Sequence, residues 1–190
     1  MNLPNKLTSL RLILTAIFVA ALTFTFPYSH TLAFVVFALA VLTDYLDGVL
    51  ARRWNLITDF GKLMDPLADK VLTAAAFILL ISYNAMPAWV VIAIIAREFL
   101  ITGLRGLASS KGIVLPAERL GKHKTAWQMI TIVFFLLLIA ADDFIKPEAN
   151  DWRAFAWEKL GPILVGITVI LTIYSGLAYF WKNRSLLETS

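Results

Sequence analysis

Long apolar runs separated by short polar segments occupy almost the whole chain, and their lengths predict six helices. Each run is close to, or reaches, the roughly 20 residues that a helix needs to cross a bilayer. The predicted spans are residues 7–26, 31–53, 62–84, 87–108, 120–141 and 160–182. We therefore expect an all-α integral membrane protein of six transmembrane helices. No repeat or linker interrupts the pattern, so residues 1–190 are expected to form one domain.

The third predicted span carries acidic residues with it. Its purely apolar run, Val71–Tyr83, has only thirteen residues, so the helix must begin earlier and include Asp65 and Asp69. Pro66 is compatible with this position, because the first turn of a helix does not need the N–H that proline lacks. The longest polar connection is expected at 142–159, where two tryptophans are typical of a segment at the membrane interface.

Composition and charge fix the expected environment. Hydrophobic residues make up 59% of the chain and the mean hydropathy is +0.77, which excludes an ordinary soluble domain. Thirteen of the 17 Lys and Arg residues fall on one side of the six-span arrangement and three on the other. The side with more positive charge is normally cytoplasmic. We expect a multi-pass protein of the cell inner (plasma) membrane, with both termini and a polar active-site cavity facing the cytoplasm.

The pI of 9.4 raises the question of a nucleic-acid partner. The basic residues follow the membrane topology, however, so anionic lipid headgroups and phosphorylated substrates explain them better. We expect membrane lipids and no nucleic acid as partners. The chain contains no cysteine, which excludes disulfides and thiolate metal ligands.

Four aspartates at the edge of two apolar runs form the most informative motif. They are Asp44, Asp47, Asp65 and Asp69. The first pair is spaced i, i+3 and the second i, i+4, so each pair shares one face of a helix. Carboxylates beside membrane spans are costly without a partner, and four hard oxygen donors suit two Mg²⁺ or Mn²⁺ ions. The alternative is that the four are surface aspartates at helix ends. Such residues would have no reason to keep this combination of spacings.

Between the acidic pairs lie two small residues and a cation. Gly48 lets a ligand approach the helix backbone closely, and Ala51 lies about one turn beyond Asp47. Arg52 can bind a phosphate through two hydrogen bonds. Close packing of helices through small residues is the alternative for the glycine and the alanine.

The complete spacing D-x2-D-G-x2-A-R-x8-G-x3-D-x3-D resembles the CDP-alcohol phosphotransferases, integral membrane enzymes of phospholipid synthesis. The resemblance implies that Asp44 and Asp65 are ligands shared by both metal ions and that Asp47 binds one of them. Asp69 would be a metal ligand and also the catalytic base that removes the acceptor hydroxyl proton. The CDP part of the donor, CDP-diacylglycerol, would be held by Gly48, Arg52 and Thr58.

The N-terminal stretch N-L-P-N-x-L-T-x2-R also resembles the family, in its bacterial branch that uses glycerol phosphate. The resemblance implies that Asn5 and Thr8 contact the donor nucleotide. From the residues alone, a capped helix start followed by an interfacial arginine, Arg11, explains the same stretch.

Basic residues in the fourth and fifth spans indicate the acceptor. Arg97 and Arg105 are eight residues apart, so both can face one cavity, and Lys122 and Lys124 begin the fifth span. Together they would bind an anionic acceptor, and the resemblance matches Arg105 and Lys122 to residues that hold the acceptor phosphate. Two alternatives remain: Glu98 pairs with a basic neighbour in a structural role, and the lysines form a membrane-anchoring cluster.

The resemblance implies transfer of a phosphatidyl group from CDP-diacylglycerol to sn-glycerol 3-phosphate by a homodimer. Sister enzymes that use inositol phosphate, serine or phosphatidylglycerol are the nearest alternatives, although a neutral acceptor leaves the arginines without an anionic partner. A cation transporter is a more distant alternative, because intramembrane carboxylates also mark ion paths. Transporters commonly have internal repeats, and this chain has none by inspection.

Overall fold

The computed structural model describes residues 3–54, 59–113, 115, 119–144 and 151–184, and the side chains of 8–44, 67–68, 70–113, 115, 121–144 and 152–184. Every element in this part of the chain is helical. The elements are α1 (Leu3–Thr23), α2 (Ser29–Trp54), α3 (Asp59–Ser82), α4 (Ala88–Ser110), α5 (Arg119–Ala141), α6 (Asp151–Phe155), the π-helical segment η2 (Ala156–Leu160) and α7 (Gly161–Lys182).

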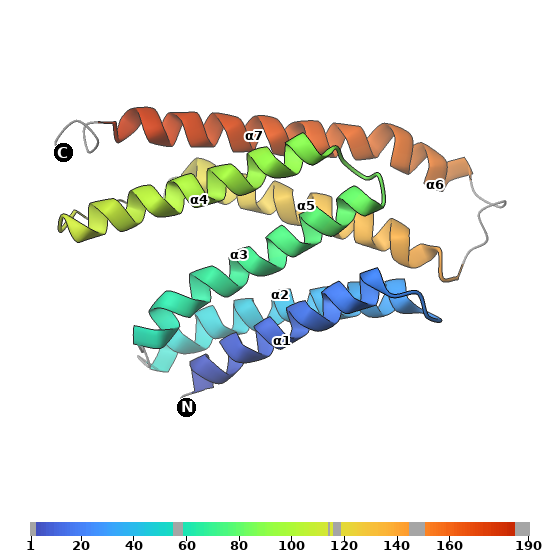
Figure 1. Cartoon of the computed structure of the whole chain (residues 1–190), viewed down its shortest axis with the longest axis horizontal. Coiled ribbons are helices and arrows are strands. Elements are labelled where there is room, and N and C mark those ends of the chain that lie inside the picture. The colour runs from blue at the N-terminus through green and yellow to red at the C-terminus, as the bar shows by residue number, and fades with distance from the viewer. Residues whose placement is uncertain (1–2, 55–58, 114, 116–118, 145–150, 185–190) are drawn as a thin grey trace.

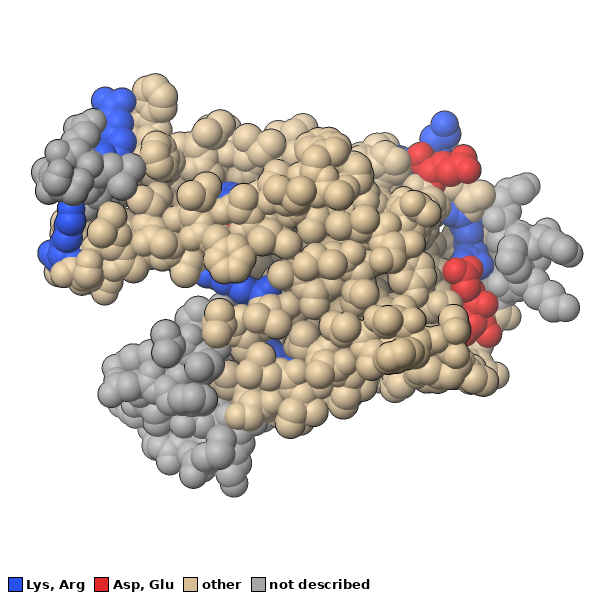
Figure 2. All heavy atoms as spheres, in the orientation of Figure 1, with Lys and Arg blue, Asp and Glu red and all other residues tan. Residues whose placement is uncertain are grey.

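The helices pack as two groups, which are joined by α5 and by the contact of α3 with α4. Helix α1 packs against α2 and α3, α4 packs against α7, and α5 contacts α2, α3 and α7. Both ends of the chain lie at the same end of the bundle (Figure 1). At that end the two groups diverge, and Figure 2 shows a hollow between them with Lys and Arg atoms on its wall.

The six long helices of the described chain begin and end within four residues of the predicted spans. Their inner faces form one core, in which Phe18, Phe37, Phe77 and Phe135 are fully buried. Large apolar side chains are also exposed on the outer faces of all six. An exterior of this kind is unfavourable in water and suits a lipid surround.

Length and composition identify two helices of the described chain that could cross a membrane by themselves, Gly121–Ala141 and Trp152–Lys182. Shorter apolar helical stretches are Thr8–Thr23, Ser29–Asp44 and Lys70–Ser82. Each of these three stretches begins or ends where the described side chains do.

The segment 142–159 differs from the polar connection that the sequence predicts, because it is helical from Asp151 onward and runs directly into α7. Packing explains the difference. The ring of Trp157 lies 5.1 Å from that of Phe135, centroid to centroid, and Arg153 Nη2 donates to the Leu138 carbonyl at 2.9 Å. Trp157 is thus part of the core and Trp152 is exposed.

The end of the bundle opposite the termini is tied together by Asp143. Its Oδ2 accepts hydrogen bonds from the backbone N–H and the hydroxyl of Thr31, each at 2.7 Å, and its Oδ1 lies 2.9 Å from His30 Nδ1. The carboxylate therefore caps the N-terminus of α2 from the loop after α5. Burial alone would raise the pKa of Asp143, but the Thr31 and His30 hydrogen bonds outweigh it and lower the pKa below its usual value.

Candidate active site

The hollow at the terminus-bearing end contains a cavity of about 470 Å³ between α3, α4, α5 and α7. Its wall carries mainly positive charge. Among the described residues, the charged side chains that line it are Lys70, Arg97, Arg105, Lys122, Lys124 and a single carboxylate, Glu98. The four basic residues predicted to hold an acceptor phosphate thus share one cavity. Their role in binding stays a prediction.

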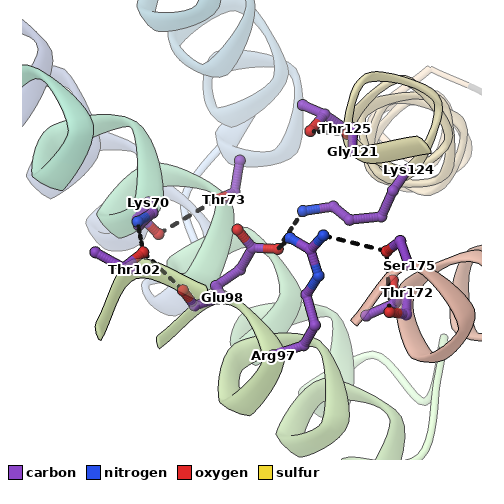
Figure 3. A network of polar contacts seen from close by, with 10 residues as sticks. All are labelled: Lys70, Thr73, Arg97, Glu98, Thr102, Gly121, Lys124, Thr125, Thr172 and Ser175. Atoms are coloured by element: carbon purple, nitrogen blue, oxygen red, sulfur yellow. Dashed lines mark hydrogen bonds and ion pairs between the residues drawn. The ribbon is translucent and has the colours of Figure 1, made fainter. Parts of the chain in front are cut away.

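Glu98 pairs with two of the basic side chains of this cavity. Its Oε1 accepts a hydrogen bond from Arg97 Nη1 at 3.2 Å and another from Lys124 Nζ (Figure 3). The prediction that Glu98 pairs with a basic neighbour is confirmed. Lys124 is only 3% exposed, so its charge needs this carboxylate as a partner. Lys122, by contrast, is an exposed cation of the cavity wall.

Helix α7 holds both arginines of α4. Arg97 Nη2 donates to Ser175 Oγ at 3.2 Å, and Figure 3 shows its guanidinium between Glu98 and Ser175. Arg105 Nε donates to the Tyr179 hydroxyl at 3.2 Å, and its guanidinium carbon lies 5.5 Å from the centre of the Tyr179 ring. The eight-residue spacing of the arginines therefore brings them to one side of α4, facing α7 and the cavity.

Lys70 is a cavity residue that sequence reasoning missed. Its Nζ donates to the hydroxyl of Thr102, which in turn donates to the Glu98 backbone carbonyl at 2.7 Å (Figure 3). The available signal was its position directly after Asp69. Ser175 and Tyr179 were also missed, and they carried no signal because they lie in an apolar helix far along the chain.

A second missed contact joins α1 to the aspartate motif. Arg11 Nη1 lies 2.8 Å from Asp44 Oδ1, and the arginine side chain is fully buried whereas that of Asp44 is 46% exposed. The interpretation of Arg11 as an interfacial arginine is therefore wrong: the charge of Asp44 lets it sit inside the bundle. Thr8 is also buried, one helical turn before Arg11.

The remaining predicted site residues lie partly or wholly outside the described region. Asn5 belongs to α1, and α2 and α3 contain the positions of the other motif residues, Asp47, Gly48, Arg52, Asp65 and Asp69, without described side chains. Thr58 lies outside the described residues altogether. Of the four predicted metal ligands only the Asp44 side chain is described, and the described side chains contain no group of three possible ligands.

The predicted metal ligands nevertheless fit the proposed ions by chemistry. Four carboxylates supply only oxygen donors, which Mg²⁺ and Mn²⁺ prefer. The C-terminal half of α2 and the N-terminal half of α3, which carry them, point to the end of the bundle at which both termini lie (Figure 1), and Figure 2 shows the hollow at that end. Carboxylates and a cationic cavity in such an arrangement can bind a nucleotide diphosphate with its metal ions beside a phosphorylated acceptor.

Comparison with known proteins places the chain in one family. The sequence profile described as CDP-alcohol phosphatidyltransferase matches residues 1–174. A Bacillus subtilis protein named CDP-diacylglycerol–glycerol-3-phosphate 3-phosphatidyltransferase is 38% identical, covering 100% of this chain and 98% of the relative. Proteins of the same name from Salmonella paratyphi A, 35% identical over 96% and 95% of the two chains, and Rickettsia bellii, 33% over 94% and 93%, are also similar. The chain belongs to the CDP-alcohol phosphatidyltransferase family.

Proposed function

We propose that this protein transfers the phosphatidyl group of CDP-diacylglycerol to sn-glycerol 3-phosphate and releases CMP. The observation that carries the proposal is the cavity with five basic side chains and one carboxylate among its described lining residues. Even after Glu98 neutralises one cation, the cavity keeps a clear positive excess. An acceptor that bears a phosphate dianion compensates this excess, whereas serine or free inositol does not. The relatives that cover almost the whole chain carry the name of this same reaction.

The reaction is an in-line displacement at phosphorus. Asp69 takes the proton of the primary hydroxyl of glycerol 3-phosphate. The hydroxyl oxygen then forms a bond to the diacylglycerol-linked phosphorus as the bond from that phosphorus to the CMP oxygen breaks. The products are phosphatidylglycerol phosphate and CMP.

The chain's own residues position the two substrates. Arg105 and Lys122 hold the acceptor phosphate, with Arg97 and Lys124 beside them. On the donor side, the nucleotide is held by the remaining predicted residues, Asn5, Thr8, Gly48, Arg52 and Thr58. This arrangement orients the acceptor hydroxyl toward the donor diphosphate, which removes much of the entropic cost of bringing the two together.

Asp44, Asp47, Asp65 and Asp69 would hold two Mg²⁺ or Mn²⁺ ions. The chemistry that such ions supply when bound is neutralisation of the diphosphate charge. The buried Arg11, 2.8 Å from Asp44, holds that carboxylate in place from the side of α1.

The membrane arrangement follows from the positions of the charges. The six long helices cross the inner (plasma) membrane, with both termini and the cavity on the cytoplasmic side, where water-soluble glycerol 3-phosphate is available. The excess of Lys and Arg on this side supports the orientation. The functional unit is a homodimer, as family resemblance implies.

An acceptor panel tests the proposal. The purified protein in detergent receives labelled CDP-diacylglycerol, Mg²⁺ and one of four acceptors: glycerol 3-phosphate, inositol phosphate, serine or phosphatidylglycerol. We expect a labelled lipid with glycerol 3-phosphate only. A product with another acceptor alone would assign the chain to a sister enzyme, and labelled cation uptake into vesicles without any lipid product would favour a transporter.

A further inference from the structure

The two arginines of α4 are contacted by three residues on one face of α7: Ser175, Gly176 and Tyr179. We call these three residues the arginine cradle. Ser175 and Tyr179 are each only 3% exposed. The family profile matches residues 1–174, so the cradle lies just beyond the matched segment. We propose that the cradle positions Arg97 and Arg105 and thereby determines the selection of a phosphate-bearing acceptor, an inference that rests on the function proposed above.

The hydroxyl of Ser175 is oriented to accept from Arg97. It donates its own proton to the Thr172 carbonyl at 3.1 Å, so its oxygen lone pairs remain for Arg97 Nη2 at 3.2 Å. On its other side, the same guanidinium is held by Glu98 through Nη1. Arg97 is therefore fixed between two helices and is only 13% exposed.

Gly176 provides the space in which Arg97 lies. A Cβ added at this position would lie 2.9 Å from Cγ of Arg97, a separation that requires the arginine stem to move. The absence of a side chain at Gly176 thus lets the aliphatic part of Arg97 pack directly on α7. Gly166, on the same helix, has no atom within 4 Å of such a Cβ, and at Gly161 the Cβ would meet Phe135, so the close approach of an arginine occurs at Gly176.

Tyr179 holds Arg105 in two ways, through its hydroxyl at 3.2 Å from Nε and through its ring at 5.5 Å from the guanidinium carbon. The ring is anchored in turn, because it packs with Ile101 and Leu104 of α4. A guanidinium fixed at Nε and over a ring keeps its two terminal nitrogens for an oxyanion.

The cradle holds the two arginines at neighbouring turns of α7. Eight helical residues separate their Cα atoms by about 12 Å along α4, whereas the four residues between Ser175 and Tyr179 span about 6 Å. Long side chains on a helix lean toward its N-terminus, which brings the Tyr179 hydroxyl closer still to Ser175. The two arginines are therefore held by neighbouring turns of α7 at the wall of one cavity.

Steady-state kinetics of cradle variants test this assignment. Tyr179→Phe removes only the hydroxyl, Ser175→Ala removes the Arg97 acceptor, and Gly176→Ala displaces the Arg97 stem. For each we expect the KM for glycerol 3-phosphate to rise about 3- to 10-fold, the scale of one hydrogen bond. The kcat and the KM for CDP-diacylglycerol should stay within about twofold, because the donor site is not touched.

Matched controls separate positioning from packing. Tyr174→Phe changes the exposed tyrosine of the same helix, Gly166→Ala adds a Cβ where there is room, and both should leave every constant unchanged. In an Arg105→Ala background, Tyr179→Phe should have no further effect on the acceptor KM, because the residue through which it acts is gone. A cradle substitution that changes kcat and both KM values by similar factors would show a merely structural role. An effect of Tyr179→Phe that persists in the Arg105→Ala background would show the same.

Turnover by the wild-type protein distinguishes failure of the proposed function from failure of the cradle assignment. Absence of turnover with glycerol 3-phosphate would overturn the proposed function and the cradle with it. Normal turnover with an unchanged acceptor KM in both Tyr179→Phe and Ser175→Ala would overturn the cradle alone. These two substitutions remove single polar atoms, so they keep the test valid if Gly176→Ala does not fold.

Discussion

Replacing Glu98 by glutamine probes the centre of the cavity most sharply. The carboxylate accepts from both Arg97 and Lys124, and Gln keeps an oxygen acceptor but removes the charge. Lys124, only 3% exposed, then loses the negative charge of Glu98. Loss of one partner from a fully buried ion pair costs about 3–5 kcal/mol. Since Glu98 itself is 24% exposed, solvent screening reduces the expected destabilisation by Glu98→Gln to about 1–3 kcal/mol.

For a chain of this length about 1 kcal/mol shifts the melting temperature by roughly 2–4 °C. We therefore expect Glu98→Gln to lower the Tm of the detergent-solubilised protein by roughly 2–12 °C in a thermal-shift assay. Glu158→Gln, at an exposed carboxylate, is the control and should change the free energy of unfolding by less than about 0.5 kcal/mol.

A second substitution tests the cause. Lys124→Met removes the cation while keeping its volume, so the double variant Glu98→Gln/Lys124→Met no longer buries a cation that has lost the charge of Glu98. We expect the double variant to be more stable than the sum of the single losses predicts, by about 1 kcal/mol or more. Strict additivity, within about 0.5 kcal/mol, would refute the view that the Glu98 carboxylate stabilises the buried lysine.

Three further predictions concern the acceptor, the base and pH. Arg105→Ala should raise the KM for glycerol 3-phosphate by roughly 10- to 150-fold, the equivalent of about 1.5–3 kcal/mol for a hydrogen bond to a charged group. Lys182 is equally basic but lies outside the cavity, so Lys182→Ala should change this KM little. Asp69→Asn should lower kcat at least ~10²-fold in the transferase assay, with donor binding weakened less, because the amide cannot take the hydroxyl proton; near-normal kcat would reassign the base. The pKa of Asp143 is lowered in the folded protein, so the stabilisation that its carboxylate provides is complete above the ordinary carboxyl pKa and is lost as the pH falls through the lower folded value. Asp143→Asn should therefore lower the Tm at neutral pH and make the Tm fall less steeply in acid. An unchanged dependence of the Tm on acid pH would contradict the capping role.

The helices could be predicted from the sequence because their signal is local. A run of about 20 apolar residues is sufficient to predict a span, and the observed helix ends fall within four residues of the predicted ones. The convergence of Arg97 and Arg105 was also predictable, since eight residues return a helix to nearly the same face. The helical start at Asp151 was not, because it depends on Trp157 packing against a helix formed earlier in the chain.

The residues that support the site could not be predicted, because they act across long sequence separations. The partners of Arg97 and Arg105 on α7 lie 78 and 74 residues away. Helix α7 is apolar around most of its surface, so its sequence does not indicate which face meets α4. The pairing of Arg11 with Asp44 could not be predicted from the sequence either, because a charged residue near the start of a span is usually interfacial.

Isotope tracing of the acceptor oxygen tests the proposed phosphatidyl transfer. The purified protein is incubated with CDP-diacylglycerol, Mg²⁺ and glycerol 3-phosphate that carries ¹⁸O in its primary hydroxyl, and both products are analysed by mass spectrometry. Attack by this hydroxyl on the diacylglycerol-linked phosphorus predicts equal amounts of CMP and phosphatidylglycerol phosphate, with the ¹⁸O retained in the lipid and none in CMP. Release of CMP without a glycerol phosphate lipid, or a lipid that lacks the ¹⁸O, would contradict the proposed phosphatidyl transfer.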